Sequence, residues 1–170
     1  PVTVNKIIDD PFIGPLLTAA DRSGLTRTFP KRDGALNTTE NLHHNIITLA
    51  RAGVPILAGT DAPNPGTTHG ASLHHELEML TIAGLSHQQA LMAATSRAAD
   101  CFQLDDRGRI RDGLQADLLL VRGNPIADIR ATRDIVRIWK AGHPIDRERR
   151  KETIRNAIEM RKSAKPEDDQ

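Results

Sequence analysis

A short apolar run that follows a helical segment constrains the fold of this chain more than any other feature. Residues Val54 to Ala58 lack the alternation of a half-exposed strand, and they lie between Gly53 and Gly59. Uninterrupted apolar runs of this kind are typical of parallel strands that are covered on both faces. A helix, a tight turn and a parallel strand form the second half of a β/α repeat. The sequence therefore predicts an α/β fold with a parallel strand over residues 54–61.

Helical patterns lie on both sides of this predicted strand. Apolar residues at helical spacing predict one helix over residues 39–52 and a second helix that ends at Gly84. A third helix is expected to begin after Ser86, which forms a capping-box pair with Gln89, and to continue to about Phe102. Helices that alternate with a buried strand favour the α/β class.

Short strands are predicted after the helices and at the beginning of the chain. Turn-forming Gly residues and an Asn-Pro pair separate runs of strand-forming residues, and this pattern predicts a small antiparallel sheet. These runs are 108–110, 116–121 and 134–140, the last with a turn at 141–142. Alternating residues also predict a strand over residues 1–8. Residues 146–170 are dominated by charged side chains, and we expect a solvated helix with a disordered end there.

Composition excludes several classes of partner. The net charge of the 170 residues is +1 at pH 7, so no overall field attracts nucleic acid or an anionic membrane. Three Phe, one Trp and no Tyr are too few for the stacking platforms of proteins that bind single-stranded nucleic acid. No apolar run approaches the roughly 20 residues of a membrane-spanning helix. The single cysteine, Cys101, fits a reducing compartment and is expected to be buried. We therefore expect a cytoplasmic protein without nucleic-acid or membrane partners.

Asp61 is the first candidate for chemistry. It follows Gly59 and Thr60 at the C-terminal end of the predicted strand, where catalytic side chains of β/α barrels project toward the mouth. A carboxylate buried among apolar neighbours requires compensation by a metal ion, a histidine or backbone donors. An equally weighted alternative is that Asp61 only caps the turn that follows.

Histidines close to Asp61 in the sequence are the next candidates. His69, His74 and His75 would fit a carboxylate and imidazole metal cluster, although their spacing matches no known ligand motif. For His74 and His75, a solvated helix face is favoured over metal ligation. His69 lies in a loop rich in Pro and Gly, which suits contact with a substrate. We take His69 and His74 as candidate substrate-binding residues.

Several motifs follow one another in a fixed order along the chain. The first group comprises 54–63 (VPILAGTDAP), 70–78 (GASLHHELE), 83–86 (AGLS), 89–91 (QAL) and 93–95 (AAT). The second group comprises 108–110 (GRI), 113–121 (GLQADLLLV), 124–125 (NP) and 136–142 (VRIWKAG). Over about residues 40–143, this order closely resembles the C-terminal part of the amidohydrolase superfamily, in particular its imidazolonepropionase-like and prolidase-like members.

The resemblance implies an architecture and a role for Asp61. The chain would be the C-terminal part of a (β/α)8 TIM barrel followed by strands of a small β-sandwich. Its expected parts are the last β/α units over residues 1–105, a β-sandwich segment over 106–145, and a charged helical or disordered tail over 146–170. Asp61 would end the eighth strand, bind a divalent metal, with zinc as the first choice, and exchange protons with the attacking water.

The resemblance also implies hydrolysis of C–N bonds in a small amide, cyclic amide or dipeptide. The family's other metal ligands, a His-x-His pair among them, have no counterpart in this sequence, and one carboxylate cannot hold a catalytic zinc. We therefore expect an inactive fragment that needs the N-terminal part of the barrel, and that forms homo-oligomers through uncovered apolar edges. The alternative is a non-catalytic truncated homologue that serves as a binding or assembly module.

Overall fold

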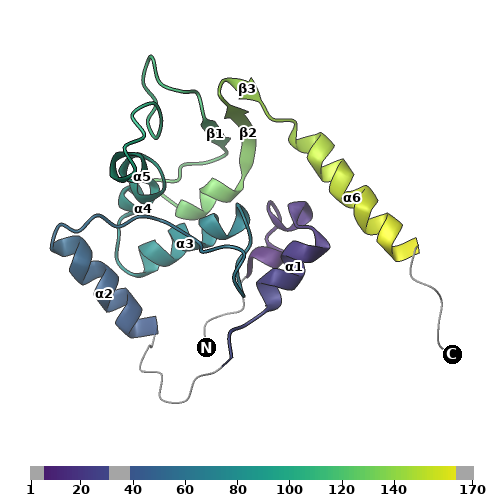
Figure 1. Ribbon diagram of the computed structural model, residues 1–170, viewed down its shortest axis with the longest axis horizontal. Helices are drawn as coiled ribbons and strands as arrows, with labels where there is room; N and C mark the ends of the chain where they lie inside the picture. Colours follow the sequence, from purple (N-terminus) through teal and green to yellow (C-terminus); the bar gives the residue numbers. More distant parts are fainter. Residues whose placement is uncertain (1–5, 31–38, 164–170) are drawn as a thin grey trace.

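The computed structural model of the chain describes residues 6–30 and 39–163 (Figure 1). The helical elements, in which η marks a 3-10 helix, are η1 (Lys6–Asp9), η2 (Gly14–Leu16), α1 (Ala19–Thr26), α2 (Thr39–Arg51), α3 (Ala71–Ile82), α4 (His87–Ala94), α5 (Ser96–Cys101), η3 (Ile129–Arg133) and α6 (Arg147–Ser163). The strands are β1 (Leu118–Val121), β2 (Ile135–Lys140) and β3 (His143–Pro144). Figure 1 shows the sheet at one end of the molecule and α6 extending away from the other helices.

The predicted helices before residue 95 are confirmed. Helices α2 and α3 occupy the expected ranges, and Gly84 follows α3 with a φ of +111°, which glycine adopts without steric cost. The capping box at the start of α4 forms as the sequence predicts. Ser86 N donates to Gln89 Oε1 at 2.8 Å, and Gln89 N donates to Ser86 Oγ at 3.1 Å. These bonds satisfy two backbone donors that the first turn of a helix leaves free.

The expectation of one continuous helix from Ser86 to Phe102 is wrong. Thr95 separates α4 from α5, with φ −130° and ψ −96°, and its hydroxyl donates back to Leu91 O at 2.7 Å. Such back-bonding by threonine bends helices. The loop after α5 also approaches this point closely. A Cβ on Gly108 would lie 2.6 Å from the Ala99 Cβ, so only glycine fits there.

The strand predicted over residues 54–61 is absent, and these residues are irregular. Val54 N donates to Leu49 O in the last turn of α2, and Ala58 N donates to Ala93 O in α4. A parallel strand needs a neighbouring strand to accept its ladder of hydrogen bonds. The described part of the chain supplies no such neighbour, because β1, β2 and β3 form a sheet of their own. The strand predicted over 1–8 is wrong for residues 6–8, which belong to η1, and residues 1–5 lie outside the description.

The small antiparallel sheet is confirmed, with the order β1-β2-β3. Leu118 pairs with Trp139 and Leu119 with Ile138, and a bulge follows Leu120. The turn between β2 and β3 lies where the sequence predicts it. Residues 108–110 form no strand, contrary to expectation. Within the described ranges the chain is thus a partial α/β arrangement with one small three-stranded sheet, and its place in a TIM barrel and a β-sandwich stays a prediction.

Two apolar clusters form the core. The first lies between α3, α4 and η3, and the second joins η1, η2 and α1. The first contains Leu77, Leu80, Leu85, Ala90, Ala93 and Ile129, and the second contains Ile7, Ile13, Leu17 and Leu25. Residues 147–163 of the charged tail form the expected helix, in which Ile154 is buried, and the disordered end expected after it lies outside the described residues. Cys101 is exposed, so the prediction that it is buried is wrong, because it ends α5 at the surface.

Candidate functional site

Asp61 begins a turn that Asn64 closes. Asn64 N donates to Asp61 O at 3.1 Å, and Asn64 Nδ2 donates to Asp61 Oδ2 at 2.6 Å. Asp61 has a φ of +49°, in the left-handed region that Asp tolerates better than most residues. The side chain is exposed. Asp61 therefore takes part in a turn, as one of the two alternatives proposed, and its carboxylate remains accessible to other groups.

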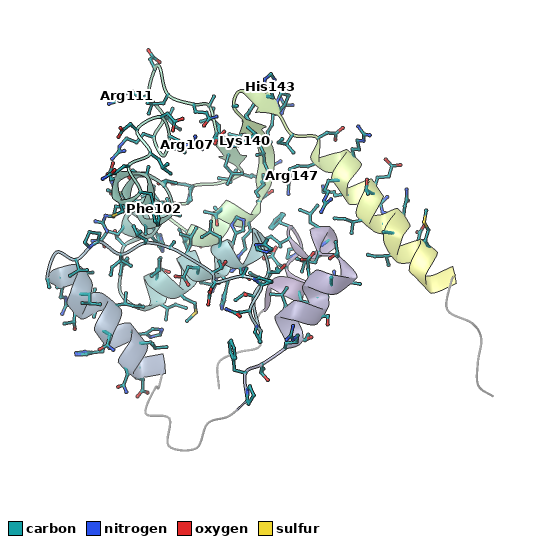
Figure 2. The ribbon with its side chains drawn as sticks, in the orientation of Figure 1. Phe102, Arg107, Arg111, Lys140, His143 and Arg147 are labelled. Atoms are coloured by element: carbon teal, nitrogen blue, oxygen red, sulfur yellow. The ribbon has the colours of Figure 1, made fainter. Side chains whose placement is uncertain are left out.

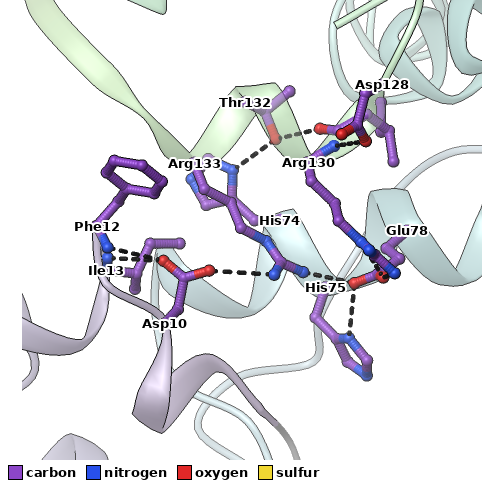
Figure 3. A network of polar contacts seen from close by, with 11 residues as sticks. Asp10, Phe12, Ile13, His74, His75, Glu78, Asp128, Arg130, Thr132 and Arg133 are labelled. Atoms are coloured by element: carbon purple, nitrogen blue, oxygen red, sulfur yellow. Dashed lines mark hydrogen bonds and ion pairs between the residues drawn. The ribbon is translucent and has the colours of Figure 1, made fainter. Parts of the chain in front are cut away.

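The two candidate substrate-binding histidines lie in different environments. His69 is exposed in the loop between Asp61 and α3. The His74 ring lies between α3 and η3, with Nδ1 3.0 Å from Thr132 Oγ1 (Figure 3). Because the Thr132 hydroxyl donates its proton to Ile129 O at 2.8 Å, His74 must donate from Nδ1. His74 is thus a hydrogen-bonded histidine at a helix contact, whereas His69 is open to solvent.

Burial sets the charge of His74. Burial, together with the nearby Arg133 guanidinium, lowers the pKa of the ring to about 4, against the opposing effect of Asp10. The ring is therefore neutral at pH 7. Burial also lowers the pKa of His75, although Glu78 opposes this, with its Oε2 3.9 Å from His75 Nδ1.

A buried ionic network, which sequence reasoning missed, joins three elements (Figure 3). Arg133 of η3 donates to Asp10 Oδ2 at 3.1 Å and to Glu78 Oε2 of α3 at 2.5 Å. The Asp10, Arg133 and Glu78 side chains are only 8%, 11% and 16% exposed. Arg130 Nε adds a bond to Glu78 Oε1 at 2.7 Å. The network joins Asp10, which follows η1, and Arg133 of η3 to Glu78 of α3, and we assign it a structural role.

The pKa of Glu78 reflects this arrangement. Burial raises the pKa of the carboxyl, but the hydrogen bond from Arg130 and the charge of Arg133 lower it more, so the net shift is downward. Glu78 therefore stays ionised at neutral pH. No local pattern predicts this contact, because 55 residues separate Glu78 from Arg133, and 123 residues separate Asp10 from Arg133.

Cationic side chains gather around the sheet and the loop before it, but acidic neighbours pair with several of them. Figure 2 shows Arg107, Arg111, Lys140 and His143 at this end of the molecule. Arg107 bonds to Asp106 at 2.8 Å, and Lys140 bonds to Asp117. The absence of a nucleic-acid partner stays a prediction.

The described residues contain no cluster of three or more His, Cys, Asp or Glu side chains that would hold a metal ion. A catalytic zinc usually has three protein ligands. The accessible carboxylate of Asp61 suits one ligand position and no more. Across residues 6–30 and 39–163, no helix is both long enough and apolar enough to span a membrane.

A model of the amidohydrolase family matches residues 26–146, which include Asp61, helices α2 to α5 and the sheet. The chain belongs to the amidohydrolase family. This confirms the resemblance found in the ordered motifs of the sequence.

Individual amidohydrolases show the same relationship. The chain is 33% identical to the imidazolonepropionase of Cereibacter sphaeroides over 102 residues, which are 59% of this chain and 21% of that protein. It is 32% identical to the adenine deaminase of Lysinibacillus sphaericus over 74 residues, or 44% of this chain and 12% of that protein. The crystal structure of a Xaa-Pro dipeptidase with bound methionine in the active site has a TM-score of 0.56 at 27% identity, over 62% of this chain and 25% of that one. The chain thus spans about a fifth or less of the length of these curated relatives.

Proposed function

We propose that this chain is the C-terminal part of a metal-dependent amidohydrolase that hydrolyses a C–N bond in a small amide, cyclic amide or dipeptide. The family match over residues 26–146 carries the proposal, because it includes Asp61 together with the helices on either side. The relatives support the substrate class, since they include an imidazolonepropionase and a Xaa-Pro dipeptidase. The N-terminal part of the barrel would supply the rest of the site.

Asp61 is the proposed catalytic residue and metal ligand of this chain. A divalent metal, with zinc as the first choice, would polarise the substrate carbonyl and acidify the attacking water. The Asp61 carboxylate would bind that metal, accept the proton of the water and pass it to the leaving nitrogen. Its exposure supports this role, because a carboxylate that exchanges protons with a substrate must be accessible.

The two histidines differ in how well they suit contact with a substrate. His69 is exposed in the loop that Asp61 begins, so we keep it as the candidate for this contact. The Nδ1 of His74 is already bound to Thr132, which leaves only Nε2 for a ligand. We therefore rank His74 below His69.

Two proteins test the proposal: the 170-residue chain, and a longer protein that also carries the N-terminal barrel with its histidines. The chain alone, with added zinc, should not hydrolyse amide or dipeptide substrates. In the longer protein, Asp61→Asn should lower kcat by about 10²–10⁴-fold, because the proton acceptor is lost. Asp112→Asn, at another exposed aspartate, is the matched control and should keep full activity. Full activity of Asp61→Asn would overturn the proposal.

Exposed apolar side chains support the further proposal that the isolated chain self-associates. Ile110, Phe102 and Ile82 are among the large apolar residues that solvent reaches. A covered barrel and sandwich would leave fewer such side chains open. Light scattering of the 170-residue chain should therefore show a homo-oligomer, and a stable monomer would contradict this part of the proposal.

A further inference from the structure

Asn64 contacts Asp61 through both its backbone and its side chain. The backbone bond, at 3.1 Å, closes the turn. The side-chain bond from Nδ2 to Oδ2, at 2.6 Å, joins a neutral donor to a carboxylate and is therefore a charge-assisted hydrogen bond between two exposed side chains. A carboxylate has about four acceptor sites, so this bond orients Asp61 while leaving acceptor capacity for another group.

Asn64 is itself held by the loop that follows it. Thr67 donates to Asn64 O twice, from N at 2.9 Å and from Oγ1 at 2.8 Å. Next to Thr67, the Gly66 amide donates to Gly24 O of α1 at 3.0 Å. These bonds connect Asn64 to a helix that lies about 40 residues earlier in the sequence, and not merely to its own turn.

The next residue of the loop extends this connection. Thr68 is buried, and its hydroxyl donates to Asp21 Oδ1 of α1 at 2.5 Å. Its amide donates to Ser72 Oγ, in the first turn of α3, at 2.9 Å. The loop that carries Asn64 is therefore fixed to α1 on one side and to α3 on the other.

The geometry points to Asn64 as the positioning residue that holds the Asp61 carboxylate in one orientation, an inference that rests on the proposed function. Asp61 is exposed, so packing alone does not select one of its side-chain rotamers. The hydrogen bond from Asn64 Nδ2 favours one rotamer of Asp61. The hydrogen bonds of the loop to α1 and α3 hold Asn64 itself in place. Catalytic groups held in this way need no reorganisation when the substrate binds.

The first experiment measures the orientation of Asp61 in the 170-residue chain. Its two vicinal Hα–Hβ couplings should be unequal in the wild type, which indicates one rotamer, and averaged in Asn64→Ala and in Asn64→Asp. Asn64→Asp keeps the shape of the side chain while removing the donor, so it separates orientation from packing. In both variants the backbone amide of residue 64 can still close the turn.

A matched control lies in another turn. Asn124 Oδ1 accepts from Ile126 N at 3.0 Å, so Asn124→Ala also removes an asparagine side-chain bond and should leave the Asp61 couplings unchanged. Unequal Asp61 couplings that persist in both Asn64 variants would overturn the inference, whether or not Asp61 is catalytic.

The second experiment separates this inference from the proposed function. In the longer protein, Asn64→Ala should lower kcat by about 10–100-fold with KM little changed, as is found for residues that orient metal ligands. If Asp61→Asn is fully active, the proposed function fails. If Asp61→Asn is inactive but Asn64→Ala keeps the full kcat, the positioning role fails and the proposed function stands.

Discussion

Two parts of the molecule that meet at α3 are stabilised in different ways. The contact of α3 with η3 contains the buried ion network of Arg133 and the hydrogen-bonded ring of His74. The segment over residues 54–64, which leads to Asp61, is largely exposed or half-buried, and its hydrogen bonds come from its own turn and from helices nearby. Polar groups that are buried must find partners within the protein, whereas exposed groups can exchange partners with solvent.

This difference in burial distinguishes residues that stabilise the fold from residues that are available for chemistry. Removing one member of a buried charged network leaves the others unpaired in a poorly solvated place, which is costly. An exposed carboxylate such as Asp61 has no such penalty and remains able to bind another group. We therefore expect substitutions at the α3–η3 contact to change the free energy of unfolding, and substitutions at Asp61 to change mainly activity.

The largest effect is expected for Arg133→Met. This change leaves Asp10 and Glu78 without their shared cation, and it should lower the free energy of unfolding by about 3–5 kcal/mol. Urea denaturation of the 170-residue chain measures it. Asp61→Asn should shift the unfolding midpoint little, because surface substitutions usually change stability by no more than about 0.5 kcal/mol.

Arg130→Met is the matched control for Arg133→Met, because Arg130 also donates to the Glu78 carboxylate. Its side chain is 65% exposed, so its bond to Glu78 competes with water. We expect a loss of no more than about 1 kcal/mol. Equal losses for the Arg133 and Arg130 variants would show that burial does not distinguish the two parts of the molecule.

The titration of His74 is expected to have a smaller effect than Arg133→Met. Burial lowers the folded-state pKa from 6.5 to about 4, so between these values the unfolded state binds a proton that the native state does not. The stability that the neutral His74 ring contributes is therefore fully present above pH 6.5. It is lost as the pH falls toward 4, and the loss is up to about 3 kcal/mol. Unfolding midpoints measured from pH 7 to pH 4.5 should fall less steeply in His74→Asn, whose Nδ2 can still donate to Thr132. Parallel curves for the two proteins would refute the assignment of a buried neutral ring.

The sequence predicts α2, α3 and the start of α4 well because the patterns that mark them are local. The spacing of apolar residues in α2 and the capping box at Ser86 involve neighbours within four residues. The strand predicted over 54–61 fails for the opposite reason. Its apolar run satisfies the demands of a buried strand, but a strand forms only where a second strand accepts its hydrogen bonds.

The candidate site shows the same limit. Asp61 is identifiable because a Gly-Thr-Asp sequence after an apolar run is a local pattern. The hydrogen bond from Asn64 is only three residues away, yet the Pro- and Gly-rich loop gives no sign of which side chain turns back. The partners of Arg133 lie 55 and 123 residues away, and no periodicity encodes a contact at such separations.

Glu76 lies in α3 and contacts the segment that leads to Asp61, so it connects the two parts of the molecule compared above. Its substitution has the smallest expected effect. This residue of α3 is half-buried, and its carboxylate accepts a hydrogen bond from the Gly59 amide, just before Asp61. Burial raises its pKa, and the bond from Gly59 only partly offsets this. A group with a raised carboxyl pKa stabilises the protein below the unfolded-state pKa, and this contribution is lost as the pH rises through the folded-state pKa. The ionised Glu76 side chain is therefore destabilising at pH 7.

Glu76→Gln keeps an oxygen that can accept from the Gly59 amide but removes the charge. It should raise the free energy of unfolding at pH 7 by about 0.5 kcal/mol. The gain should disappear at pH 4, where the wild-type carboxyl is mostly protonated. A Glu76→Gln protein that is less stable than the wild type at pH 7 would show that the Glu76 carboxylate stabilises the fold, contrary to this expectation.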